Sequence, residues 1–242
     1  MNFGIIAAGE GSRLVEEGVA YPKPLVPLNG VPMIERLIDI FTRAGAGMIC
    51  IIVNEQMTEV RQYIERRIAD SDTVIKLVVK STPSSMHSFY EISKELRGHG
   101  RFIVTTVDTI FHEADFTGYV RAYENAPETV QGMMALTRYI DDEKPLYVDT
   151  NNEMDITGFL DSPTDGWKAG MKFISGGIYG LGDAAVDVLQ LCLDNNVSRM
   201  RNYQRSLIEN GLHIKGYDMG KIIDVDHAGD IKKAEEFLRI PN

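Results

Sequence analysis

The sequence predicts an α/β protein of three layers, in which a mostly parallel sheet carries helices on both faces. Met48 to Val53, reading MICIIV, is a continuous apolar run of the kind that is buried on both faces in a parallel sheet. Runs of this kind alternate with amphipathic helical patterns along the first half of the chain, and the joins between them are short. This alternation predicts strand-helix-strand units in a doubly wound sheet.

The first half of the chain supplies these units in order. Helices are indicated where apolar residues recur at i, i+3, i+4 and i+7, and strands where apolar and β-branched residues form short runs. The expected elements are a strand at Phe3 to Ile6, a helix from Pro32 to about Gly45, the strand Met48 to Val53, a helix at Gln56 to Ile68, a strand at Val74 to Val79, a helix at about Phe89 to Leu96, a strand at Arg101 to Val107 and a helix at Ala114 to Asn125.

The second half has shorter extended runs separated by turn-rich segments, which predicts a small mixed or antiparallel extension of the sheet. The expected strands are Met133 to Arg138, Leu146 to Asp149, Ile156 to Leu160, Phe173 to Leu181, His213 to Tyr217 and Ile222 to Val225, and helices are expected at Ala184 to Leu193, at Met200 to Asn210 and after Asp230 as N-cap. Trp167, the only tryptophan, either packs this extension or shapes a pocket in it.

The composition of the chain limits the kinds of partner that it can bind. The chain has 242 residues, 44% of them hydrophobic, which suits one large domain with a buried core. The net charge of -10 argues against a nucleic acid or an anionic membrane as partner, since either attracts a basic face. Cys50 and Cys192 lie in apolar runs without metal-ligand spacing, as reduced core cysteines of cytosolic proteins do. With no leader pattern and no membrane-length apolar run, we expect a soluble, cytoplasmic protein.

The opening stretch, NFGIIAAGEGSRLVEEGVAYPKPLVP, predicts a site for a polyphosphate. Small residues replace bulky ones where the first strand leaves the sheet, namely Ala7, Ala8, Gly9 and Gly11. Glycine allows positive φ and lets backbone N–H groups approach a ligand closely, as phosphate-binding loops require. Arg13 and Lys23 add two cations beside these donors, and Pro22 and Pro24 hold the backbone around Lys23 extended.

Two familiar phosphate motifs do not describe this stretch. The dinucleotide fingerprint needs a third glycine after Gly9 and Gly11 and a long helix directly after the loop, which Gly18, Pro22 and the following prolines prevent. A Walker A loop is excluded because no Gly-Lys-Ser/Thr is present. What remains is A-G-x-G-S-R-L followed by P-K-P-L.

This combination closely resembles the signature of the sugar-phosphate nucleotidylyltransferases and cytidylyltransferases. The resemblance implies a Rossmann-like sheet of the nucleotide-diphospho-sugar transferase type. It also implies that the loop from Ala7 to Ser12, with Ala8, Gly9 and Gly11, wraps the nucleotide phosphates. In the same family the arginine and the lysine, here Arg13 and Lys23, neutralise those phosphates. A tight turn with two solvated cations is the purely structural alternative.

The segment KSTPSSMHS, residues 80–88, is a polar loop before a helix. In the nucleotidyltransferase family that the chain resembles, the loop at this point reaches the base and the ribose. The resemblance therefore makes Ser85, His87 and Ser88 candidate nucleotide contacts. Ser88 and Glu91 also have the spacing of a capping box, so Ser88 is alternatively a helix N-cap.

Two aspartates are candidate metal ligands. Asp108 follows an apolar strand, and ligands in open α/β sheets collect outside the carboxyl ends of strands. The sequence VDTIF resembles the family position where an aspartate holds the catalytic metal, although an aspartate there also caps turns. The chain ends like the family with V-D-x-x-x-D, which gives the second ligand role to Asp226, with Asp224 as the less favoured choice. Two carboxylates beside phosphates suit Mg²⁺.

The acceptor side is less well defined. FISGGIYGL, residues 173–181, resembles a family segment around N-A-G-I-Y, but Ser175 and Gly176 replace the usual asparagine and alanine. This weakens a hexose assignment, because a hydroxyl replaces an amide that both donates and accepts hydrogen bonds. Arg199, Arg201 and Arg205 form a basic cluster that either is a solvated face or meets an anionic substrate.

These features lead to one functional hypothesis with two alternatives. We expect a single domain in which residues 1–130, approximately, bind a nucleoside triphosphate and residues 131–242 bind a small phosphorylated acceptor, such as a sugar 1-phosphate or a phosphocholine-like group. The expected reaction is Mg²⁺-dependent transfer of the nucleotidyl group with release of pyrophosphate. The alternatives are a metal-dependent glycosyltransferase, for which Asp224-Val225-Asp226 matches Asp-x-Asp, and a nucleotide-binding protein without catalysis. The sequence specifies neither the base, nor the acceptor, nor the oligomeric state.

Overall fold

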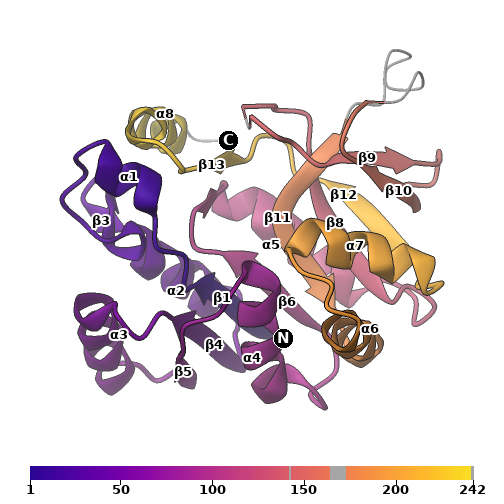
Figure 1. Cartoon of the computed structure of the whole chain (residues 1–242), viewed down its shortest axis with the longest axis horizontal. Coiled ribbons are helices and arrows are strands. Elements are labelled where there is room, and N and C mark those ends of the chain that lie inside the picture. The colour runs from indigo at the N-terminus through magenta and orange to yellow at the C-terminus, as the bar shows by residue number, and fades with distance from the viewer. Residues whose placement is uncertain (142, 164–172, 241–242) are drawn as a thin grey trace.

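Nine of the ten predicted strands join in one sheet, ordered β10-β9-β11-β6-β1-β4-β5, with β8 attached to β11 and β12 attached to β8 (Figure 1). The structure is a computed structural model that describes residues 1–141, 143–163 and 173–240, so that Trp167 lies outside the described residues. Within those residues no helix combines the length and the apolar character that crossing a membrane requires.

Four strands form the parallel part of the sheet. They are β1 (Asn2–Ala7), β4 (Met48–Val53), β5 (Ile75–Val79) and β6 (Phe102–Thr106), and every pairing among them is parallel. All residues of β4 are buried, as the apolar run MICIIV predicts for a strand covered on both faces.

Helices cover both faces of the sheet, which confirms the three-layer prediction. Phe3 and Ile5 of β1 belong to a core shared with α2 (Met33–Arg43), α3 (Thr58–Ala69) and α5 (Glu113–Glu124). Ile6 points to the opposite face and packs in a second core with α4 (Ser85–Leu96), α6 (Asp183–Asp194) and α7 (Met200–Glu209). Successive side chains of one strand thus separate the two cores, as the period of a strand requires.

The mixed extension is built around one long strand. β11 (Phe173–Leu181) pairs antiparallel with β6, with β8 (Gly132–Thr137) and with β9 (Tyr147–Thr150). β10 (Ile156–Leu160) pairs antiparallel with β9, and β12 (Ile214–Asp218) pairs parallel with β8. The register of β11 against β8 shifts between Ser175 and Tyr179, which marks a bulge.

The end of the chain returns to its beginning. β7 (Thr109–Ile110) and β13 (Ile223–Asp224) form a small antiparallel ribbon, after which α8 (Ala228–Arg239) packs near α1 (Ser12–Glu16), as Figure 1 shows. The carboxylate of Glu17 accepts a hydrogen bond from the backbone N–H of Ala228 at 2.6 Å. A 3₁₀ turn (Lys23–Leu25) and the hairpin of β2 (Pro27–Leu28) and β3 (Val31–Pro32) connect α1 to α2. We call residues 222–227, between β12 and α8, the C-terminal strap.

Two expected helix starts are wrong. α4 begins at Ser85, not near Phe89, because Ser84 adopts the extended N-cap conformation; Ser88 lies inside the helix, where its hydroxyl pairs with that of Thr82. The N-cap of α8 is His227. Asp230 is the third helical residue, and its carboxylate accepts the backbone N–H of His227 at 2.9 Å. Both changes shift a predicted cap by about one turn.

Candidate active site

The glycine loop between β1 and α1 lies at the carboxyl edge of the parallel strands. Gly11 has a φ of 62°, and a Cβ on it would lie 2.8 Å from Cβ of Lys23, so only glycine fits there. Gly9 differs, because its φ is not positive and a Cβ would meet nothing within 4 Å. Gly11 therefore serves the fold of the loop, whereas Gly9 leaves open space above it.

Lys23 is the centre of the site. Its side chain is 9% exposed, and its Nζ lies 2.5 Å from Oδ2 of Asp108 and 2.7 Å from Oδ1 of Asp226. Burial alone would lower the pKa of this lysine, but attraction by the two carboxylates outweighs burial and raises it above its usual value. Lys23 is therefore a fixed cation at neutral pH.

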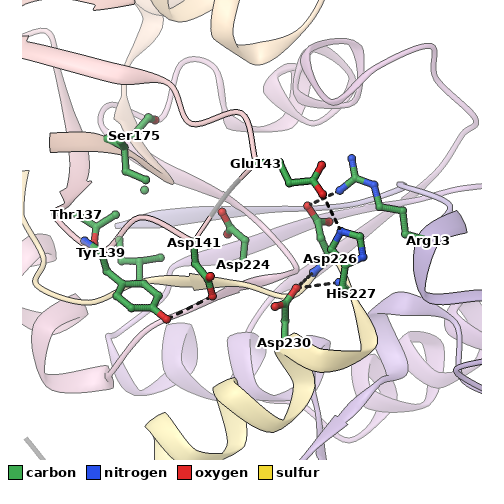
Figure 2. Close-up of a pocket in the computed structure, with 13 residues that line it drawn as sticks. Arg13, Thr137, Tyr139, Asp141, Glu143, Ser175, Asp224, Asp226, His227 and Asp230 are labelled. Atoms are coloured by element: carbon green, nitrogen blue, oxygen red, sulfur yellow. Dashed lines mark hydrogen bonds and ion pairs between the residues drawn. The ribbon is translucent and has the colours of Figure 1, made fainter. Parts of the chain in front are cut away.

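Asp108 and Asp226 approach Lys23 from distant parts of the chain. Burial alone would raise the pKa of Asp108, but the Lys23 ammonium outweighs burial and lowers it, so the carboxyl is ionised. Asp226 sits on the C-terminal strap, and its Oδ2 accepts a hydrogen bond from Nη1 of Arg13 at 3.1 Å (Figure 2). The strap is held in place because the backbone N–H of Val225 donates to the carbonyl oxygen of Asp108 at 3.1 Å.

These residues fit a hard divalent cation. Oδ1 of Asp108 is buried and has no hydrogen-bond partner among the described residues, so an acceptor oxygen is left for a ligand. No cluster of three or more metal-binding side chains occurs in the described part of the chain. Mg²⁺ binds through one or two carboxylates and completes its shell with water and substrate phosphates, and the pair Asp108 and Asp226 is of that kind.

A cleft of about 660 Å³ lies over the glycine loop, and we call it the nucleotide cleft. Its volume is in the range of small-molecule binding sites. Of the predicted site residues, the structure brings the following into its lining: Ala8, Gly9, Gly11, Ser12, Arg13, Lys23, Ser85, Ser88, Asp108 and Asp226. Ala7 and His87 do not line it; Ala7 is buried in β1, and Nδ1 of His87 is hydrogen-bonded to the Ser84 hydroxyl at 2.9 Å.

Sequence reasoning missed several lining residues. Asn54 and Thr106 stand at the carboxyl ends of β4 and β6, so the rule that singled out Asp108 also applied to them. Thr82 and Ser84 belong to the polar loop that we expected to reach the base, and no local signal separated them from their neighbours.

A second cleft of about 280 Å³, which we call the acceptor cleft, adjoins the first. The two share Ser85, Thr106, Asp108 and Asp226. The acceptor cleft is also lined by Ser175, Gly177, Tyr179, Arg199, Arg201 and Gln204. The predicted acceptor segment in β11 therefore does reach the carboxylates, as do two arginines of the predicted basic cluster.

The unusual Ser175-Gly176 pair has a packing explanation. Ser175 donates a hydrogen bond from its hydroxyl to Oε1 of the buried Gln204 at 2.8 Å. A Cβ on Gly176 would lie 2.4 Å from Cδ1 of Ile222 and 3.1 Å from the carbonyl oxygen of Ala135. The glycine thus allows the C-terminal strap to pack directly on β11.

A third cavity, drawn in Figure 2, lies beside Asp226, and Asp141, Asp224 and Asp230 are among the residues that line it. Its volume is about 50 Å³, far below that of a substrate site. Two of its carboxylates are already paired, since Asp141 and Asp230 both contact Nζ of Lys233. It is therefore part of the packing behind the strap.

This chain is similar in sequence to several known proteins. The bifunctional protein GlmU of Methanococcus maripaludis is 25% identical over 229 residues, which cover 91% of this chain and 52% of that protein. The 2-aminoethylphosphonate cytidylyltransferase of Lancefieldella rimae is 40% identical over 63 residues, 26% of this chain and 25% of that protein. The chain thus spans about half the length of the GlmU relative.

Solved structures share the fold. The inositol-1-phosphate CTP transferase from T. maritima superposes with a TM-score of 0.80 at 14% identity, covering 98% of this chain and 94% of that one. CTP:phosphocholine cytidylyltransferase (LicC) from Streptococcus pneumoniae gives a TM-score of 0.74 at 18% identity, covering 98% of both chains. A family model described as the MobA-like NTP transferase domain matches residues 4–145, more than half of the sequence. The chain belongs to this nucleotidyltransferase family.

Proposed function

We propose that this protein transfers the nucleotidyl group of a nucleoside triphosphate to a small phosphorylated acceptor and releases pyrophosphate. The observation that carries the proposal is that the nucleotide cleft and the acceptor cleft meet at Asp108 and Asp226, beside the buried cation Lys23. A transfer between two bound phosphates needs this arrangement of two adjoining clefts with one shared centre. Family membership favours it over the glycosyltransferase and the non-catalytic binder.

On the donor side, the open space at Gly9 and the backbone of the loop admit the triphosphate, and Lys23 and Arg13 neutralise it. Such transfers depend on positioning and charge neutralisation more than on a covalent nucleophile. An acceptor phosphate is already ionised near neutral pH, so no general base is required to activate it. Asp108 and Asp226 would hold Mg²⁺, which supplies charge neutralisation at the reacting phosphates when bound.

On the acceptor side, Arg199 is the candidate anchor for the phosphate. Its guanidinium has no ion-pair or hydrogen-bond partner among the described residues, whereas Nη1 of Arg201 is held by Asp161 at 2.9 Å. The backbone of Arg199 has a φ of 73° and a ψ of 139°, a conformation that costs a non-glycine residue free energy. A strained residue that directs an unpaired cation into a cleft fits a role in binding an anion.

CTP is the first triphosphate to test, because the relative with the highest identity reported above is a cytidylyltransferase for an aminophosphonate. We further propose that residues up to about 130 form the donor part, that the remainder forms the acceptor part of the same domain, and that the protein works in the cytoplasm, where nucleoside triphosphates are found.

The test is a pyrophosphate-release assay. The protein is incubated with each of ATP, CTP, GTP, UTP and dTTP, with Mg²⁺, and with a panel of sugar 1-phosphates, inositol phosphate, phosphocholine and 2-aminoethylphosphonate. We expect release that requires both an acceptor and Mg²⁺ and that stops when EDTA is added. Consumption of a nucleotide sugar with release of the nucleotide, and without release of pyrophosphate, would instead support the glycosyltransferase.

A further inference from the structure

The nucleotide cleft has both of its lining cations at one end, and the lining carboxylates among the described residues are Glu10, Asp108 and Asp226. Among the described residues that line it, the cations are Arg13 and Lys23, both near the reacting centre. The opposite end is lined by uncharged polar groups, including Asn54, Thr82 and Ser84. A triphosphate belongs at the charged end, which leaves the uncharged end for the nucleoside.

The order of the strands supports this direction. β1 lies between β4 and β6, with Ala7 beside Val53 on one side and Ile6 beside Thr106 on the other. Residues that follow these strands therefore line up along one edge: Asn54, then the glycine loop, then Asp108. Because the reaction takes place at Asp108, the end of the nucleotide away from the reaction lies toward Asn54.

The amide of Asn54 is buried and oriented. The residue is 7% exposed, and its Oδ1 accepts hydrogen bonds from the backbone N–H of Gln56 at 2.9 Å and from the Ser81 hydroxyl at 3.0 Å. A backbone N–H can only donate, so the oxygen of the amide must be the atom that faces Gln56. The other end of the amide is therefore its NH₂ group.

None of the described residues accepts a hydrogen bond from Nδ2 of Asn54, and Nδ2 is not among the buried polar atoms that lack one, so solvent reaches it. The accessible space next to Asn54 is the nucleotide cleft. A donor that is held in place at the uncharged end of this cleft is suited to an acceptor on the base.

We infer that Asn54 is a specificity residue, whose amide NH₂ donates a hydrogen bond to a carbonyl oxygen or ring nitrogen of the nucleobase. This inference rests on the proposed use of a nucleoside triphosphate. Both lone pairs of Oδ1 are occupied within the protein, so Asn54 only donates and selects bases that present an acceptor at that point. Ser81 acts as a positioning residue.

The decisive variant is Asn54→Asp. It keeps an oxygen for Gln56 and Ser81, so the loop should fold, but it replaces the donor with an acceptor. Calorimetry would measure the affinity for the triphosphate that binds the wild type best and, separately, for inorganic tripolyphosphate. We expect the affinity for the triphosphate, divided by the affinity for tripolyphosphate, to fall about 10- to 100-fold. This is the usual loss when a buried hydrogen-bond partner is removed.

Gln56→Glu is the matched control, because it makes the same amide-to-carboxylate change at an exposed residue two positions away, which does not line the cleft. It should leave the ratio unchanged. An equal loss for the triphosphate and for tripolyphosphate in Asn54→Asp would mean charge repulsion alone and would overturn the inference, as would an unchanged ratio.

A second variant tests the inference independently if Asn54→Asp does not fold. Ser81→Ala removes the hydroxyl that orients the amide and should lower the same ratio by about threefold or more, at unchanged thermal stability; no change in the ratio would overturn the inference. If the wild type binds a triphosphate but releases no pyrophosphate with any acceptor, the proposed function fails while the ratio still decides the role of Asn54.

Discussion

The proposed nucleotide part and the proposed acceptor part of this molecule are built in different ways. In the nucleotide part, parallel strands of regular register end at one edge, and the predicted strands and helices largely match those in the structure. In the acceptor part, β11 contains a bulge, Gly177 has a φ of 73°, and Arg199 has a strained backbone. Regular strands set the position of the glycine loop, whereas the proposed acceptor part beside it contains irregular backbone. Variants that separate these two contributions test the comparison.

The largest effect is expected at the centre that both parts share. Asp108→Ala should reduce turnover at least about 10³-fold with little loss of fold, because the site loses one of the two carboxylates that both clefts share. Steady-state pyrophosphate release measures it. Asp187→Ala, an exposed carboxylate on α6 paired with Arg97, is the control and should behave like wild type. Wild-type turnover in Asp108→Ala would make the metal assignment wrong.

The next effect belongs to the nucleotide part. Lys23→Ala should cost on the order of 10²-fold in kcat, as loss of one electrostatic stabiliser does. It also leaves the largely buried Asp108 without its cation, which should cost about 1–3 kcal/mol of the free energy of unfolding. Denaturant unfolding and turnover are measured on the same preparation. Lys76→Ala, whose exposed ion pair with Glu95 lies elsewhere, should change both by little.

Arg199 tests the acceptor part. Arg199→Gly should raise the KM for the acceptor about 10-fold through loss of a charged hydrogen bond, while the KM for the triphosphate stays constant. The same change removes a side chain from a conformation that favours glycine, so the free energy of unfolding should rise by about 1 kcal/mol. Arg97→Gly, at an exposed residue outside both clefts, should not alter either KM. A rise in both KM values would show that Arg199 attracts anions at both clefts and does not bind the acceptor specifically.

The smallest effect on turnover is expected at the contact between β11 and the C-terminal strap. Gly176→Ala places a methyl against Ile222 and the backbone of Ala135, and should cost about 1–3 kcal/mol by overpacking. Turnover should fall as well, because Ile222 leads into the segment that carries Asp226. Gly158→Ala in β10 is the control, since a Cβ there meets nothing within 4 Å. Equal thermal stability of the two variants would contradict the packing explanation.

Local sequence was sufficient to predict a structural feature where that feature depends on the residues of the segment itself. The run MICIIV predicts a fully buried strand because no polar side chain interrupts it, and Gly11 is required by a positive φ in the loop itself. Helix starts were predicted less well, because Ser84 and Ser88 offer similar capping chemistry and the surrounding fold selects one of them. Asn54 was missed because an asparagine after a strand carries no charge that signals a site.

The sequence alone determined the three-layer fold, the glycine loop with Arg13 and Lys23 near it and the family, because periodicity, glycine and proline act over a few residues. Only the tertiary structure decided that Asp108 and Asp226 share the ammonium of Lys23, and that the two clefts meet there. The pairing of β7 with β13 joins residues more than a hundred positions apart, and such a contact depends on the packing of the whole chain.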